Sequence, residues 1–232
     1  MLLAVVLVVS GALVAGAALG IYGKLPERLE GFLVALAGGA LLLSVTTELI
    51  EPSIETASVF HAMLGVAAGA VVFAFADYLI DERWGPDDGG GLLAAITLDG
   101  IPENLALGVA LIGVGGAEVA ALAGSILLSN LPEAAGGARA MVSGGHGRGK
   151  VMLLWLGTAI LLSLAAIVGN LALAGVGEDA LAVIRCFAAG AVVASLATEV
   201  FPQAFREDRH WAGIATALGV ILAFSLGSLT GG

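Results

Sequence analysis

The stretch DGIPENLALG, residues 99–108, places two acids, a proline and an asparagine inside an otherwise apolar part of the sequence. A second stretch, SNLPEAAGGA at residues 129–138, repeats the Pro-Glu pair in similar surroundings. Ionisable groups are costly within hydrophobic segments, so their presence there points to a function. Whether the surrounding sequence spans a membrane therefore decides the fold and how these polar residues are to be interpreted.

That surrounding sequence is strongly apolar. Of the 232 residues, 59% are hydrophobic and 12% are charged, whereas about 25% are charged in ordinary soluble domains. A helix needs about 20 apolar residues to cross a bilayer. Eight such segments can be identified, at residues 2–22, 31–50, 58–80, 91–113, 117–141, 151–175, 181–203 and 211–230. Since backbone polar groups in lipid must be satisfied internally, we predict an all-α polytopic membrane protein, with one domain over residues 1–232.

The basic residues predict the orientation in the membrane. If the N-terminus is outside, the outer side carries only Arg185, and eight basic residues fall on the inner side: Lys24, Arg28, Arg83, Arg139, Arg148, Lys150, Arg206 and Arg209. Cytoplasmic loops carry an excess of Lys and Arg. We therefore expect a multi-pass protein of the cell membrane with both termini outside. No positive charge precedes the first apolar segment, which argues against a cleaved signal peptide.

Two of the segments resemble each other. GALLLSVTTEL at 39–49 and GAVVASLATEV at 190–200 share a serine and a Thr-Glu pair at the same spacing, so Glu48 aligns with Glu199. In the predicted topology the two segments run in opposite directions, which is typical of the inverted repeats of secondary transporters. The repeats would be the first three and last three segments, in a 3+2+3 arrangement. Chance similarity between two helices rich in small residues is the alternative.

The two Pro-Glu stretches bring oxygen ligands together on helix faces. Residues four apart lie on one face, about 6 Å apart along the axis. Asp99 therefore shares a face with Glu103, and Ser129 shares one with Glu133, with Asn130 beside it. Each proline also loosens the carbonyl four residues before it.

Such carboxylates need a counter-charge. An acid at the bilayer centre costs about 2.5–3.5 kcal/mol or more, and neighbouring acids repel. Protons or divalent cations could offset this cost, and oxygen ligands suit hard or borderline cations. A purely structural kink with protonated packing residues is the alternative.

The two stretches resemble motifs of the ZIP (Zrt/Irt-like) family of divalent-metal transporters. In that family the fourth helix carries a His-Asn-x-Pro-Glu-Gly-type motif and the fifth a related x-x-x-Pro-Glu-Gly motif. Eight spans, outward termini and a 3+2+3 arrangement also look like that family. The resemblance covers essentially the whole chain by architecture and is specific at the two Pro-Glu pairs. It implies a transporter that moves divalent cations by alternating access.

The resemblance also implies a site for two metal ions, bridged by Glu103 and Glu133. Its implied ligands are Asp99, Glu103, Ser129, Asn130, Glu133 and Glu199. Asp99 and Ser129 would lie toward one ion, with Asn130 and Glu199 toward the other. Glu48 and Asp77, near the ends of their segments, are candidates for the path by which ions enter and leave, or are simply solvated there.

The sequence departs from the family at positions that affect metal preference. Asp99 stands where the family usually has His, and Gly100 stands where it has Asn. No histidine lies in either motif, and the short acidic segment DERWGPDDGG at 81–90 replaces a histidine-rich loop. An oxygen-rich site favours manganese or ferrous iron, although zinc also accepts carboxylates. The expected substrate is therefore Zn, Mn or Fe.

Two other functions are compatible with the composition: an intramembrane metal-dependent hydrolase and a metal sensor that does not transport. No Gly-x-Gly-Asp or His-Glu-x-x-His motif occurs in the sequence, so we do not expect an enzyme. The expected partners are divalent metal ions and membrane lipid, with no nucleic acid; a homodimer is left open.

Overall fold

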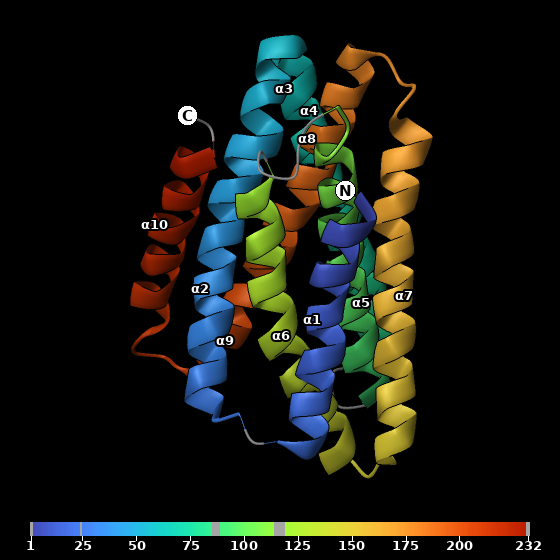
Figure 1. The fold of residues 1–232 in the computed structure, drawn as a ribbon, viewed down its shortest axis with the longest axis vertical. Helices are drawn as coiled ribbons and strands as arrows, with labels where there is room; N and C mark the ends of the chain where they lie inside the picture. Colours follow the sequence, from blue (N-terminus) through green and yellow to red (C-terminus); the bar gives the residue numbers. More distant parts are fainter. Residues whose placement is uncertain (1, 24, 85–88, 114–118, 231–232) are drawn as a thin grey trace.

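The computed structural model describes residues 2–23, 25–84, 89–113 and 119–230, which form a bundle of eight helical rods (Figure 1). Six rods are single helices: α1 (Leu2–Tyr22), α4 (Val59–Trp84), α5 (Gly89–Ala110), α6 (Ala120–Ser143), α7 (Arg148–Leu173) and α10 (Ala212–Thr230). The other two are each interrupted by a π-helical turn. They are α2 (Glu27–Val45) with η1 (Thr46–Ile50) and α3 (Glu51–Thr56), and α8 (Glu178–Ser195) with η2 (Leu196–Val200) and α9 (Phe201–Glu207). Lys24 and residues 85–88 of the acidic segment lie outside the described residues.

The all-α prediction is confirmed, and the composition of the helices is that of a multi-pass membrane protein. Within the described residues, six helices are long and apolar enough to cross a bilayer: Leu2–Tyr22, Glu27–Thr56, Val59–Leu79, Arg148–Leu173, Glu178–Glu207 and Ala212–Leu229. Large apolar side chains such as Phe75, Leu153 and Phe224 point outward from these helices, as on a lipid-facing surface. The helices α5 and α6, which carry the two Pro-Glu stretches, are not among the six.

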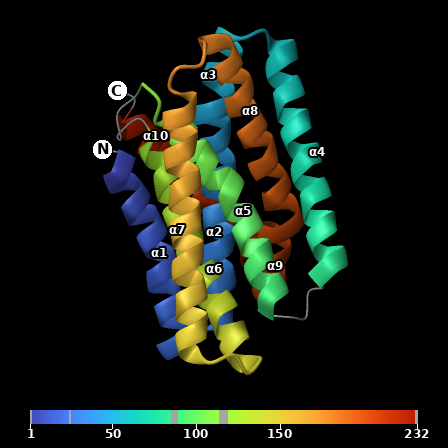
Figure 2. The same ribbon diagram turned by 90° about the vertical axis from the view of Figure 1, so that its right-hand side faces the viewer.

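The helices α5 and α6 lie among the other rods. Helix α6 contacts α1, α2, α5, α7 and α10, while α5 contacts α4, α6, α7 and α8. The two views of the bundle show α1 and α7 on one side of this pair and α4 on another (Figure 2). Polar side chains within membrane segments almost always face a bundle interior, and this arrangement gives those of α5 and α6 such an interior.

The two sequence-matched segments make matched contacts. Helix α2 packs on α10, and α8 packs on α4. At the first contact a Cβ on Gly39 would collide with the carbonyl oxygen of Thr216, and at the second a Cβ on Gly190 would collide with that of Val66. Aligned glycines thus permit the same close approach of backbones in both pairs, as small residues do in membrane helix packing.

Each matched rod widens into a π-helical turn just before a proline. The amide of Glu51 donates to the carbonyl of Thr46, and that of Phe201 donates to the carbonyl of Leu196, which is the i to i+5 pattern of a π-helix. Pro52 and Pro202 follow directly. A proline has no amide proton and crowds the carbonyl four residues earlier, so the helix widens there. These turns contain the predicted path residue Glu48 and the predicted ligand Glu199.

Candidate cation site

A cavity of about 240 Å³ lies between α2, α5, α6 and the rod formed by α8, η2 and α9. Asp99 of α5, Glu133 of α6 and Glu199 of η2 line it. The cavity extends to the end of the bundle where α2 begins and where α6 and α9 end, because Glu30, Arg139 and Glu207 also line it. Three of the six predicted ligands therefore face one space that opens toward one end of the molecule.

Asp99 is buried within this cavity wall, with 8% of its surface exposed. The hydroxyl of Ser195 on α8 donates a hydrogen bond of 3.0 Å to Asp99 Oδ1. The carboxylate also lies within Coulombic range of Glu133, Glu199 and Asp77. Ser195 was not predicted as a site residue, and the only sequence signal for it is the serine shared by the two matched segments.

Glu103 and Glu133, the predicted bridging acids, are both buried and lie within Coulombic range of each other. Their exposed fractions are 2% and 8%. Glu133 lines the cavity, whereas Glu103 is outside its lining. Within the described part of the chain, Glu133 Oε1 is buried and has no hydrogen-bond partner. A buried polar atom without a partner is costly, so this oxygen is suited to accept a ligand from the cavity.

Ser129 and Asn130 have protein partners in this conformation. The Ser129 hydroxyl donates to the carbonyl of Ile126 in its own helix at 3.1 Å. The Asn130 side-chain amide donates to the carbonyl of Val9 on α1, also at 3.1 Å. Both residues are nearly fully buried, and neither lines the cavity. In this conformation their hydrogen bonds join α6 to itself and to α1.

The two predicted path residues lie in different surroundings. Glu48 Oε1 accepts the backbone amide proton of Leu122 at 3.0 Å, in the first turn of α6. A carboxylate is favourable there, because the first amides of a helix lack intrahelical partners and carry partial positive charge. Asp77 on α4 is buried and lies within Coulombic range of Asp99. Of the two path residues, Asp77 is therefore the one near a predicted ligand.

The acids share one region, but they do not form a closed cage. Among the residues that the structure describes, no three His, Cys, Asp or Glu side chains are close enough together to hold a metal ion. Asp99, Glu133 and Glu199 supply the oxygen ligands that hard and borderline cations prefer. A metal ion held by all three would require their side chains to move closer to one another than they are here.

The sequence matches no protein-family model and no curated protein. Because one fold can host many functions, the chemistry of the site has to carry any functional assignment. For this bundle that chemistry is a set of buried carboxylates around a cavity.

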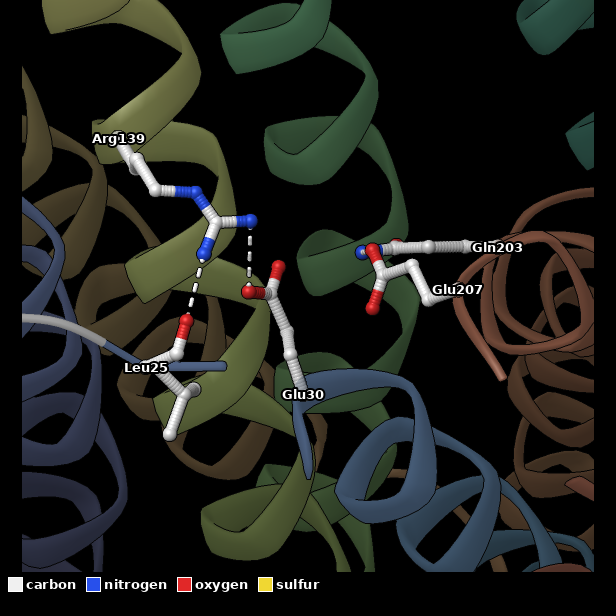
Figure 3. Close-up of polar contacts among 5 residues, drawn as sticks. All are labelled: Leu25, Glu30, Arg139, Gln203 and Glu207. Carbon is white, nitrogen blue, oxygen red and sulfur yellow. Dashed lines mark hydrogen bonds and ion pairs between the residues drawn. The ribbon is translucent and has the colours of Figure 1, made fainter. Parts of the chain in front are cut away.

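Sequence reasoning did not identify the polar residues at the open end of this cavity. Glu30, Arg139, Gln203 and Glu207 line it there (Figure 3). Glu30 falls just before a predicted apolar segment and Arg139 near the end of another, so each resembled an ordinary charge at the edge of a membrane segment. Only the contact between them, across two helices, distinguishes them from such residues.

Proposed function

We propose that this protein transports a divalent metal cation across the membrane by alternating access, and that it is a divergent relative of the ZIP family. The observation that carries this proposal is the cavity lined by Asp99, Glu133 and Glu199, which come from three different helices. Asp99 and Glu133 are buried and Glu199 is partly buried. Acids inside membrane bundles are rare, and where they occur they usually mark ion pathways.

The chemistry of the cavity favours a cation over other substrates. Its inner part presents carboxylates, one of which has an oxygen without a hydrogen-bond partner in the described chain. A divalent cation would offset the repulsion between these acids and occupy the free acceptor. The oxygen-rich set suits manganese or ferrous iron, and zinc also accepts such ligands.

In this proposal Glu103 and Glu133 hold the metal between α5 and α6, and Asp99 and Glu199 complete the ligand set. Ser129 and Asn130 would join after the side-chain rearrangement that closes the site around the ion. Asp77 and Glu48 would lie along the path on either side. The hydrogen bonds that Ser129 and Asn130 make here are single contacts, which such a rearrangement can exchange.

The proposed membrane topology has eight spans in a 3+2+3 inverted repeat, with both termini outside. Support comes from the matched packing of α2 on α10 and of α8 on α4. Basic residues also gather at the end of the bundle where the cavity opens: Arg139 and Arg206 line it, and Arg148 lies 5.9 Å from the ring of Tyr22 at the end of α1. By the positive-inside rule this end faces the cytoplasm, so the cavity would be open to the inside.

Manganese flux into sealed proteoliposomes tests the proposal. Glu103→Gln and Glu133→Gln should each abolish uptake, because the amide removes the negative charge while keeping the size of the side chain. Glu51→Gln, at an exposed glutamate of α3, is the matched control and should leave uptake unchanged. Normal flux in both site variants would exclude the site, and manganese binding without flux would favour the sensor function.

A further inference from the structure

The open end of the cavity holds an ion pair that joins two helices, between a buried acid and a partly exposed arginine. Arg139 Nη2 on α6 lies 2.9 Å from Glu30 Oε2 on α2. Arg139 Nη1 donates at 2.8 Å to the carbonyl of Leu25, in the connection between α1 and α2 (Figure 3). Glu30 is 1% exposed. The guanidinium is therefore held at two points, and it provides the buried carboxylate with its counter-charge.

A second acid lies beside this pair. Glu207 of α9 is within Coulombic range of both Glu30 and Arg139. Its Oε1 accepts a hydrogen bond of 3.1 Å from the Gln203 side chain, while its Oε2 is buried without a hydrogen-bond partner among the described residues. Arg206 also lines the cavity and lies within Coulombic range of Glu207, whereas Glu30 forms its ion pair with Arg139.

Helix α6 is shaped to let the Glu30 carboxylate reach this position. A Cβ on Gly136, one turn before Arg139, would collide with Glu30 Oε1. A side chain at position 136 would therefore require the Glu30 carboxylate to shift from this position. The glycine at position 136 thus leaves room for the Glu30 carboxylate against α6.

The ion pair lies on the path from the proposed metal site. Glu133 lines the same cavity, is 8% exposed, and has a carboxylate oxygen without a hydrogen-bond partner among the described residues. It lies within Coulombic range of Glu207. A cation that leaves Glu133 through this opening would pass two acids that attract it, Glu30 and Glu207, and two guanidinium groups that repel it, those of Arg139 and Arg206.

We propose that Arg139 is a tethered counter-cation, which holds Glu30 and prevents the acidic mouth from retaining the departing metal ion. This inference rests on the proposed transport function. Without Arg139, Glu30, Glu207 and the Gln203 amide oxygen would offer a divalent cation two anionic ligands and one neutral ligand, all of them oxygen. Because the guanidinium is held by the Leu25 carbonyl and lies 2.9 Å from Glu30 Oε2, it occupies the Glu30 carboxylate in place of the metal ion, and the ion is released instead of being trapped.

A binding experiment isolates the mouth from the central site. Bound Mn²⁺ is counted on the detergent-solubilised protein carrying Glu103→Gln and Glu133→Gln, which removes the proposed central site. In this background Arg139→Gln should gain a bound Mn²⁺ ion, and the further change Glu30→Gln should abolish the gain. Arg139→Lys keeps the positive charge and should gain none. A folded Arg139→Gln variant that gains no ion, or a gain that survives Glu30→Gln, would overturn the proposal.

A transport experiment covers the case in which Arg139→Gln does not fold because Glu30 is left buried and unpaired. With the central site intact, Glu30→Gln leaves the guanidinium without its carboxylate, and Mn²⁺ flux per folded protein should fall severalfold. The double variant Glu30→Gln with Arg139→Gln should recover most of that flux, and a failure to recover would contradict the role of Arg139. Mn²⁺ binding is also measured with and without Glu103→Gln and Glu133→Gln. If these two changes leave binding unchanged, the proposed central site is wrong. If they abolish it, the results for Arg139 and Glu30 test this inference alone.

Discussion

Glu48 and Glu199 lie in the two π-helical turns at aligned positions of the sequence, yet their carboxylates face different surroundings. Glu48 accepts the amide proton of Leu122 at the start of α6, whereas Glu199 lines the cavity beside Asp99. π-Helical turns are often found at functional sites. In the proposed transporter this asymmetry would correspond to a state that is open on one side only, since inverted repeats exchange such environments during transport.

Substitution of the serine that precedes each turn tests this asymmetry directly. Ser195 donates to Asp99, while its counterpart Ser44 faces Ser125 at 3.3 Å. Hydrogen bonds to metal ligands typically contribute about 10- to 100-fold in metal affinity. We expect Ser195→Ala to weaken Mn²⁺ binding by about tenfold and Ser44→Ala to leave it nearly unchanged. Equal effects in a Mn²⁺ titration would show that the hydrogen bond to Asp99 does not orient this carboxylate.

The close helix contacts at Gly39 and Gly190 predict that a larger residue at either position lowers the stability of the fold. Gly39→Ala and Gly190→Ala each place a methyl group against a carbonyl oxygen of the neighbouring helix, and overpacking of this kind costs about 1–3 kcal/mol. Gly157→Ala is the matched control, because nothing lies within 4 Å of a Cβ there, and alanine is favoured over glycine within helices by about 1 kcal/mol.

The measurement is the midpoint of thermal unfolding in detergent. The midpoint should fall for Gly39→Ala and Gly190→Ala and should hold or rise for Gly157→Ala. If all three variants unfold at the same temperature, the close approaches of α2 to α10 and of α8 to α4 do not limit stability.

The positions of the helices were predictable because apolar length is a local property. The segment at 2–22 coincides with α1, Leu2–Tyr22. The segment at 31–50 corresponds to a rod that runs from Glu27 to Thr56. It was predicted too short because hydropathy falls at the acids of its two ends, while the helix continues through them. The π-helical turn within this rod has no hydropathy signal at all.

The site was predictable only in part, for a related reason. Asp99 and Glu133 were identified because their own neighbours, the Pro-Glu pairs, are unusual within apolar helices. The hydrogen bond from Ser195 to Asp99 joins residues 96 positions apart, and the pair of Glu30 with Arg139 joins different helices. Such contacts depend on which helices are adjacent in the bundle, and no local pattern in the sequence contains that information.

The proposed orientation can be tested with single cysteines. Cys186 is the only cysteine and is buried, so Cys186→Ser provides a background without thiols. Ser58→Cys and Gly147→Cys then introduce thiols at exposed positions near opposite ends of the bundle. An impermeant thiol reagent should label Ser58→Cys on intact cells, and Gly147→Cys only after permeabilisation. The reverse pattern would place both termini in the cytoplasm.

The identity of residue 99 should set the metal preference. Asp99 lines the cavity and lies within Coulombic range of Glu133 and Glu199, and the proposed relation to the ZIP family aligns it with a position that is usually His there. A carboxylate adds an anionic oxygen to an oxygen-rich site, whereas imidazole adds a neutral nitrogen, which suits zinc better than manganese. Asp99→His also removes one negative charge and so relieves the repulsion among the acids of the empty site.

We therefore expect Asp99→His to shift selectivity toward zinc and away from manganese while the variant still binds metal. The measurement is the transport of each metal with the other as competitor, in the unmodified protein and in the variant. Asp99→Asn is the matched control: it removes the same charge without adding a nitrogen ligand for the metal, so it should weaken both metals without favouring zinc. A selectivity ratio that is unchanged in a folded, active Asp99→His variant would mean that Asp99 does not contact the metal.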